Sequence, residues 1–195
     1  MTPGPLLALL AAVMTAIHRL IEVHAATRGD AIAIVDGGRS ISYRELNATA
    51  NTLARRLMAA GFRRGMRTDV PMAPSADLAV LLLAILKAGG CYAWNEREPD
   101  DRSSDLLMSV GGIPLEVHCS PNLPVITRGT DIACVLESGA GEPPIAVPHA
   151  TVMSMASRPV GDRSPWAGEC GAFDLWIALM SGVTAVVPER RAAAA

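Results

Sequence analysis

The run of small and acidic residues at Glu137–Pro144 is the part of this sequence whose composition most clearly suggests chemistry. It follows a short apolar stretch, and a small-residue loop after a strand lets backbone N–H groups approach a phosphate closely. The candidate phosphate ligands of this loop are Ser138, Gly139, Ala140 and Gly141. Neither the dinucleotide-binding glycine pattern nor the Walker pattern, with its lysine and hydroxyl residue, is present. Taken alone, the loop fits either a phosphate site or a surface turn between a strand and a helix.

The other reactive side chains do not have the spacing of a metal or catalytic site. The cysteines include no C-x-x-C pair, so we expect reduced thiols that pack as small apolar groups. They are Cys91, Cys119, Cys134 and Cys170. His18 and His24 lie six positions apart on one expected helix and do not share a face. Lys87 ends another expected helix, where the helix dipole favours a cation. We therefore assign no metal ligand and no catalytic residue.

The composition predicts one globular domain. Of 195 residues, 50% are hydrophobic and 18% are charged, which argues against a disordered chain and against a disulfide scaffold. With 17 basic and 19 acidic side chains, the protein has no excess positive charge for binding nucleic acid. The apolar run 6–17 is too short to span a bilayer and no positive residue precedes it. We expect a cytoplasmic protein without membrane contact, with a signal peptide as the alternative.

Alternating helices and strands must position the loop. Apolar residues at helical spacing predict helices over residues 6–26, 43–60, 76–87 and 100–109. Short apolar runs predict strands over residues 31–35, 39–42, 68–73, 91–94, 115–118 and 131–136. This alternation predicts an α/β fold with a mostly parallel sheet flanked by helices. Along the chain we expect an N-terminal extension at 1–14, one subdomain at 15–189 and a frayed tail at 190–195.

Three local signals support these boundaries. Ser42 and Glu45 have the spacing of a capping box at a helix start. Ser75 is a second N-cap candidate. Pro71 cannot donate a hydrogen bond to a neighbouring strand, so it predicts an edge strand or a bulge.

Four segments resemble the adenylation domains of nonribosomal peptide synthetases, which belong to the adenylate-forming (AMP-binding) ligase superfamily. Ile41–Asn47 resembles their L-T-Y-x-E-L-N motif, and Leu86–Tyr92 resembles L-K-A-G-x-A-Y. Ile17–Glu22 lies where such domains begin, and Gly29–Ala33 resembles their x-D-A-x-A strand. The segments follow the family's order at near-family spacing from about Ala16 to Arg102. The resemblance implies the first part of the large N-terminal subdomain of an adenylation domain.

The resemblance implies a ligase that uses ATP and Mg²⁺. Such an enzyme activates an amino acid or another carboxylic acid as an acyl-adenylate, releases pyrophosphate and passes the acyl group to a phosphopantetheine thiol. It must hold the β- and γ-phosphates with backbone donors and a cation while placing the substrate carboxylate in line with the α-phosphorus. The partners it implies are synthetase modules and a small MbtH-like protein.

The loop departs from the family's phosphate-loop pattern, Y-T-S-G-[ST]-T-G-x-P-K-G. The matching residues are Ser138, Gly139, Gly141 and Pro143. Pro144 stands where the lysine is expected, and proline supplies neither a cation nor an N–H donor. Glu137 and Glu142 add negative charge beside a loop meant for polyphosphate. We therefore expect the loop to bind ATP weakly.

Asp174 is the candidate substrate-binding residue. Gly171–Asp174 resembles the family's F-D-x-S segment, whose aspartate pairs with the substrate's α-amino group. The run Trp176–Val187 resembles the helix and strand that follow it, and Val147–His149 resembles the V-P-H that opens an earlier helix. The step from Asp174 to Trp176 is shorter than in the family, so Asp174 is alternatively an N-cap or first-turn acid of a helix. Both interpretations stay open.

The family's adenine- and ribose-binding segments and its C-terminal subdomain with the catalytic lysine come after the segment that matches Val187. We therefore expect a truncated, diverged adenylation-domain fragment that is inactive alone. The alternatives are a non-catalytic interaction or structural piece of a synthetase, and a fragment of an acyl-CoA or aryl-acid ligase of the same fold. A parallel sheet cut midway leaves an unpaired edge, so we also expect self-association.

Overall fold

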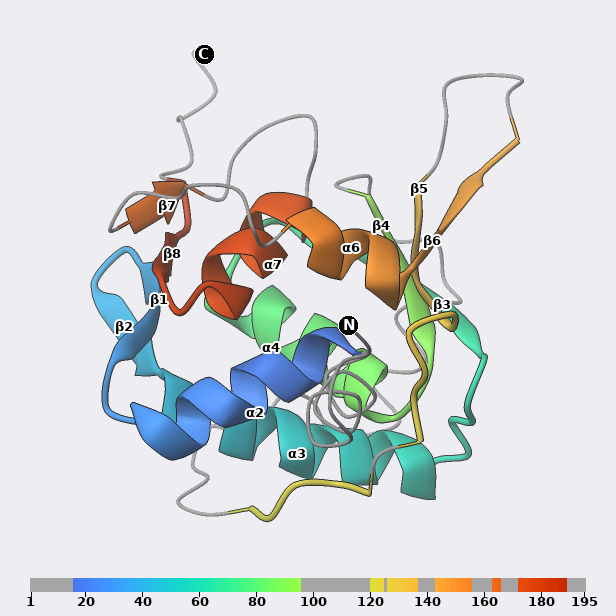
Figure 1. Cartoon of the computed structure of the whole chain (residues 1–195), viewed down its shortest axis with the longest axis horizontal. Helices are drawn as coiled ribbons and strands as arrows, with labels where there is room; N and C mark the ends of the chain where they lie inside the picture. The colour runs from blue at the N-terminus through green and yellow to red at the C-terminus, as the bar shows by residue number, and fades with distance from the viewer. Residues whose placement is uncertain are drawn as a thin grey trace, which may run out of the picture.

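A computed structural model describes residues 16–95, 120–124, 126–136, 143–155, 163–165 and 172–188. In this part of the chain, two four-stranded sheets stand on either side of a group of helices (Figure 1). The helices are α2 (Ile17–Thr27), α3 (Tyr43–Ala59), α4 (Ala76–Lys87), α6 (His149–Met155) and α7 (Ala172–Met180). The strands are β1 (Ile32–Asp36), β2 (Arg39–Ser42), β3 (Arg67–Pro71), β4 (Cys91–Asn95), β5 (Ile132–Leu136), β6 (Ile145–Pro148), β7 (Arg163–Pro165) and β8 (Thr184–Val186). The elements expected at 100–109 and 115–118, the extension 1–14 and the tail 190–195 lie outside the described residues.

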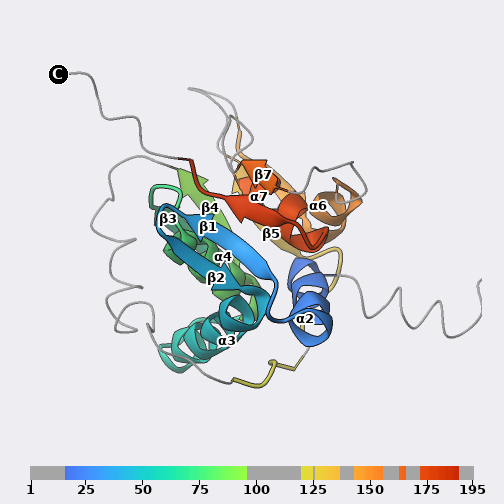
Figure 2. The ribbon, with the colours of Figure 1, turned by 90° about the vertical axis from the view of Figure 1, so that its left-hand side faces the viewer.

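Each sheet has a parallel centre and one antiparallel hairpin at its edge. The first sheet has the order β2-β1-β8-β7, in which β8 is parallel to both β1 and β7 (Figure 2). The second has the order β3-β4-β5-β6, in which β4 is parallel to both β3 and β5. The hairpins are β1–β2 and β5–β6. The expected α/β class with mostly parallel strands flanked by helices is confirmed, although the strands form two sheets and not one.

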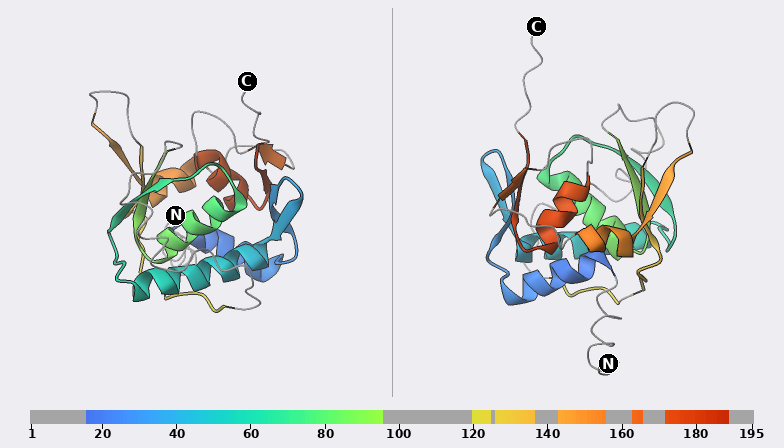
Figure 3. Two further views of the ribbon diagram at one scale, coloured as in Figure 1. Left: turned by 180° about the vertical axis from the view of Figure 1, so that it is seen from behind. Right: turned by 45° about the horizontal axis from the view of Figure 1, so that its top comes forward.

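Helix α4 forms the centre of the core, between the two sheets (Figure 3). Its sequence ADLAVLLLAILK is apolar almost all round, and every residue of it except Asp77 is buried. A helix of this kind is stable only where protein covers its whole circumference. Helices α2 and α3 lie on one side of it and α6 and α7 on the other (Figures 1 and 3). None of the described helices is long and apolar enough to cross a membrane.

The local signals set the helix starts as the sequence predicts. Ser42 Oγ accepts a hydrogen bond from Glu45 N, and the Glu45 carboxylate accepts one from Ser42 N, which completes the capping box of α3. Ser75 Oγ accepts from Leu78 N (3.1 Å) at the start of α4. Strand β3 ends at Pro71 and lies at the edge of its sheet, the position where proline is tolerated.

Strand β6 is not predicted by the sequence. It pairs antiparallel with β5, from Leu136↔Ile145 at one end to Ile132↔Pro148 at the other. The loop with the candidate phosphate ligands therefore connects two strands, so the expectation of a strand-to-helix turn is wrong. Helix α6 begins at His149, directly after β6, as V-P-H predicts.

The turn at Gly89 and Gly90 joins α4 to β4, and Gly90 has no room for a side chain. Gly89 has a φ of +81°, and Gly90 N donates to Ile85 O (3.0 Å), as in a Schellman helix end. A Cβ on Gly90 would lie 2.3 Å from the Phe62 ring and 2.9 Å from Met66 O. We expect Gly90→Ala to lower the free energy of unfolding by about 1–3 kcal/mol in urea denaturation, as overpacking does.

Gly38→Ala is the matched control, because a Cβ on Gly38 meets nothing within 4 Å. We expect this variant to change the free energy of unfolding by less than about 0.5 kcal/mol. Equal losses in the two variants would mean that packing against Phe62 does not restrict the turn.

Candidate functional site

The β5–β6 hairpin carries the candidate phosphate loop. Its last described pair is Leu136 and Ile145, with exposed fractions of 38% and 56%. The predicted ligands Ser138, Gly139, Ala140 and Gly141 fall between these two residues and lie outside the described residues. Their role stays a prediction. Pro144, directly before β6, is exposed and has no N–H to offer a phosphate.

Asp131 holds the base of this hairpin together. Its carbonyl oxygen accepts a hydrogen bond from His149 N (3.0 Å), which ties the start of β5 to the end of β6. Its carboxylate forms an ion pair with Arg64 (2.7 Å) and accepts from Arg128 N (2.9 Å). Partial burial opposes ionisation, but these two partners hold the pKa of Asp131 below its ordinary value. The hairpin is therefore fixed at its base to the loop that follows α3.

His149 connects the hairpin to α2. Its ring is fully buried, and Nδ1 accepts a hydrogen bond from Ile17 N (3.3 Å), the first amide of α2. The ring also packs edge-on against that of His18, with centroids 6.1 Å apart. Nε2 of His149 and Nδ1 of His18 have no hydrogen-bond partner among the described residues. Both imidazoles are thus enclosed at the junction of α2 and α6.

Lys87 and Glu22 form a buried ion pair between α4 and α2. Lys87 Nζ lies 2.5 Å from Glu22 Oε1, and the two side chains are 0% and 5% exposed. Arg19 makes a second ion pair with the same carboxylate. Burial lowers the pKa of Lys87 to about 8, although Glu22 opposes the shift. Lys87 does end its helix as expected, but its partner is a buried carboxylate and not only the helix dipole.

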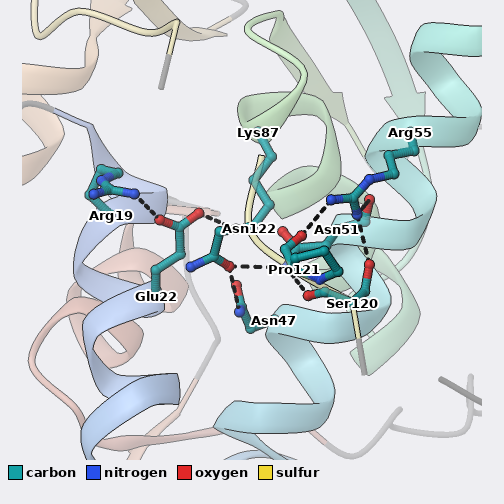
Figure 4. A network of polar contacts seen from close by, with 9 residues as sticks. All are labelled: Arg19, Glu22, Asn47, Asn51, Arg55, Lys87, Ser120, Pro121 and Asn122. Atoms are coloured by element: carbon teal, nitrogen blue, oxygen red, sulfur yellow. Dashed lines mark hydrogen bonds and ion pairs between the residues drawn. The ribbon is translucent and has the colours of Figure 1, made fainter. Parts of the chain in front are cut away.

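A ladder of polar side chains on α3 binds the segment 120–122 (Figure 4). Asn47, Asn51 and Arg55 recur every four residues and so share one face of the helix. Asn51 Nδ2 donates to Ser120 O (2.8 Å), and Asn47 Nδ2 donates to Asn122 Oδ1 (2.9 Å). The Arg55 guanidinium donates to Ser120 Oγ (2.7 Å) and to Pro121 O (2.5 Å). This ladder fixes the course of the chain well before it enters β5.

Asp174 is the third residue of α7, in the first turn of that helix, and its side chain is half-buried. This is a position where the helix dipole favours an acid. Its assignment to substrate binding stays a prediction.

Together these contacts support the β5–β6 hairpin from α2, α4 and the loop after α3. The described part of the chain contains no group of three or more metal-ligating side chains. The buried carboxylate of Glu22 is already paired with two cations, Arg19 and Lys87. The arrangement can hold α2, α4 and the hairpin in place.

Sequence comparison matches residues 21–105 to a family model described as AMP-binding enzyme. Malpibaldin synthetase of Mortierella alpina is 38% identical over 96 residues, which cover 49% of this chain and 2% of that protein. Bacitracin synthase 1 of Bacillus licheniformis is 27% identical over 210 positions, which cover 89% of this chain and 4% of that protein. This chain thus spans a few per cent of the length of these relatives.

Structure comparison finds the same fold in the N-terminal subdomain of NpsA from Klebsiella oxytoca, solved in complex with 3-hydroxybenzoyl-AMSN. The TM-score is 0.72 at 18% sequence identity. The match covers 89% of this chain and 53% of that one, so this chain spans about half the length of the solved subdomain. At this identity, the similarity concerns the fold alone.

Substitutions in the buried ion pair of Lys87 and Glu22 test whether this pair stabilises the fold. We expect Lys87→Met to lower the free energy of unfolding by about 3–5 kcal/mol, because Glu22 is left buried with a single cation. Replacing both residues, as Glu22→Leu with Lys87→Met, should recover most of this loss, because no uncompensated charge stays buried. Urea denaturation at pH 7 measures both variants.

Arg44→Met is the control for the loss of an ion pair at the surface. Arg44 pairs with Asp30, and these side chains are 59% and 91% exposed. We expect a loss below about 1 kcal/mol in this variant. If Lys87→Met cost as little, the buried pair would not hold α2 to α4.

Proposed function

This chain is part of an adenylation domain of the nonribosomal peptide synthetase type, and we propose that it no longer forms an acyl-adenylate on its own. The family to which it is similar activates amino acids with ATP and Mg²⁺. In this proposal, the 195 residues are a diverged fragment that has kept the fold of this family but not its reaction.

The single observation that carries the proposal is Pro144. Adenylation needs donors and a cation around the β- and γ-phosphates, because negative charge must be stabilised as pyrophosphate leaves. Pro144 stands at the lysine position of the loop, is exposed and directly precedes β6. It offers neither the cation nor the N–H. The described end of the loop, at Pro144, therefore does not fit a triphosphate.

The negative charges of the loop also oppose the binding of ATP. Glu137 and Glu142 flank the small residues that would cradle phosphate. Two like charges about 4 Å apart repel by roughly 4 kcal/mol at an effective dielectric constant near 20, and by much less in open solvent. At either value, this repulsion opposes the binding of a polyanion such as ATP.

The length of the alignment with a relative also supports the proposal that this chain is diverged. The match to bacitracin synthase 1 extends over 210 positions, which exceeds the 195 residues of this chain. That relative therefore has residues within the matched region that this chain lacks. The step from Asp174 to Trp176, which is shorter than in the family, fits such losses.

A second candidate function is a non-catalytic binding piece, and the exposed end of the β5–β6 hairpin favours it. β6 is the last strand of its sheet in the described part of the chain, and it exposes Ile145 beside Leu136. An edge strand with apolar side chains is a template for pairing with another chain. We propose synthetase modules, an MbtH-like protein or a second copy of this chain as its partners.

Amino-acid-dependent exchange of pyrophosphate into ATP tests the first proposal. We expect the isolated chain to give no exchange above background with any of the common amino acids, because the loop lacks its cation. A complete adenylation domain assayed in parallel controls for the reagents. Exchange by protein that is free of contaminating synthetase would overturn the proposal.

Nucleotide binding tests the damage to the loop directly. A few hydrogen bonds of roughly 0.5–1.5 kcal/mol each reach the 4 kcal/mol or so that millimolar affinity needs only at the upper end of this range, and the charges of Glu137 and Glu142 subtract from the sum. We expect titration calorimetry to give an ATP affinity weaker than millimolar. Pro144→Lys combined with Glu137→Thr should strengthen it.

Pro144→Ala is the matched control, because it restores an N–H donor without adding a cation. Weaker recovery in this variant than in the lysine variant would assign the defect mainly to the missing charge. Micromolar affinity in the unmodified chain would mean that the loop is competent.

A further inference from the structure

We propose that His149 is an acid-sensitive latch between α2 and the β5–β6 hairpin. In its neutral form the imidazole caps the first turn of α2, and protonation opens this contact. The inference concerns the fold of this chain and does not depend on the proposed loss of adenylation.

The start of α2 has no cap of its own. Its N-cap residue is Ala16, whose side chain cannot accept a hydrogen bond, although the first amides of a helix need acceptors. Ile17 N finds its acceptor in Nδ1 of His149, 132 residues further along the chain. Ala16, Ile17 and His149 are all 0% exposed, so solvent does not reach this contact.

The cap requires the neutral ring with a bare Nδ1. A neutral imidazole has one donor and one acceptor nitrogen, whereas an imidazolium has two donors. A proton on Nδ1 would therefore point an N–H at the N–H of Ile17. The same residue closes the hairpin base through its backbone, since His149 N donates to Asp131 O (3.0 Å). Loss of the cap therefore acts on α2 and on the hairpin together.

The surroundings also resist a further positive charge. Besides His18, α2 carries Arg19, Glu22 and His24, and α4 carries Asp77 and Lys87. Asp131, just before β5, pairs with Arg64, and Asp174 lies in the first turn of α7. Glu22 already binds two cations, and Asp131 is already paired. A proton on either histidine would thus add a positive charge beside Glu22 and Asp131, whose carboxylates are already paired.

The sign of the pH effect follows from burial. Burial lowers the pKa of His149 to about 4, with Asp131 opposing the shift, and burial, helped by Lys87, holds the pKa of His18 well below its ordinary value. An unfolded histidine titrates near 6.5. The unfolded chain therefore binds more protons, so stability is complete above about pH 6.5 and falls as the pH drops below that value.

The test is urea unfolding of the full chain at pH 7.5 and pH 5.5. For one histidine with these two pKa values, the unfolding constant rises about tenfold between the two conditions. His149→Asn keeps a carbonyl acceptor for Ile17 N and cannot titrate. We expect the ratio of the unfolding constants at pH 5.5 and pH 7.5 to be about ten times smaller in this variant than in the wild type.

His24→Asn is the matched control, since His24 lies on the same helix, is half-buried and bonds to Met180 O. We expect this variant to keep the His149 component of the pH dependence. The same pH dependence in His149→Asn and in the wild type would overturn the proposal.

A second measurement covers the case in which His149→Asn does not fold. Long-range ¹H–¹⁵N NMR spectra of the wild type report which imidazole nitrogen carries the proton. We expect Nδ1 of His149 to be bare at pH 7.5 and the ring to stay neutral in the folded chain at pH 5.5. A protonated Nδ1 in the folded protein at pH 7.5 would overturn the latch.

Discussion

Helix α4 has apolar side chains around nearly its whole circumference, so the rest of the fold must enclose it. Two sheets and four helices do so, and they come from segments far apart in the sequence. Of its two charged residues, Asp77 lies near the surface and Lys87 is buried where the helix ends. A buried ammonium group needs a counter-charge, and Glu22 provides it. The demand for burial of α4 thus also determines where α2 must lie.

The sequence predicts well those features that depend on interactions between residues close together in the chain. Ser42 and Glu45 are three positions apart, and the capping box that they form needs no contact with the rest of the protein. Pro71 predicts an edge strand or a bulge, because proline lacks the N–H that a central strand needs, and β3 is an end strand of its sheet in the described part of the chain. These features depend on backbone chemistry within one turn or one strand, which a single sequence displays directly.

What the sequence predicts poorly depends on contacts between distant segments. Strand β6 is four residues long and ends in Pro148, so its pattern is weak, and pairing with β5 makes it a strand. The partners of Lys87 and of the α2 amides lie 65 and 132 residues away. One signal was available for Lys87, because a lone cation at the end of an otherwise apolar helix needs a buried partner. The candidate ligands 138–141 are known from sequence pattern alone, since they lie outside the described residues.

The motifs that this chain shares with adenylation domains serve packing in this structure. Tyr43 of the I-S-Y-R-E-L segment donates its hydroxyl hydrogen toward the backbone oxygens of Leu179 and Val183 (3.1 and 3.0 Å), at the end of α7. Lys87 of the L-K-A-G segment holds α2. Residues with such packing roles can be retained for the fold independently of the reaction. Family resemblance in this region therefore reports architecture more reliably than reaction.

The capping of α2 by His149 also matters while the chain is being synthesised. Ile17 leaves the ribosome 132 residues before His149. At about 5–20 residues per second, this interval lasts roughly 7–26 s. During that time the first amide of α2, an 11-residue helix, lacks its acceptor, although α3 and α4, which also pack against α2, emerge earlier. Isolated helices of this length are marginal in water. The start of α2 must therefore stay uncapped until the second half of the chain has been synthesised, so α2 completes its fold late although it is made first.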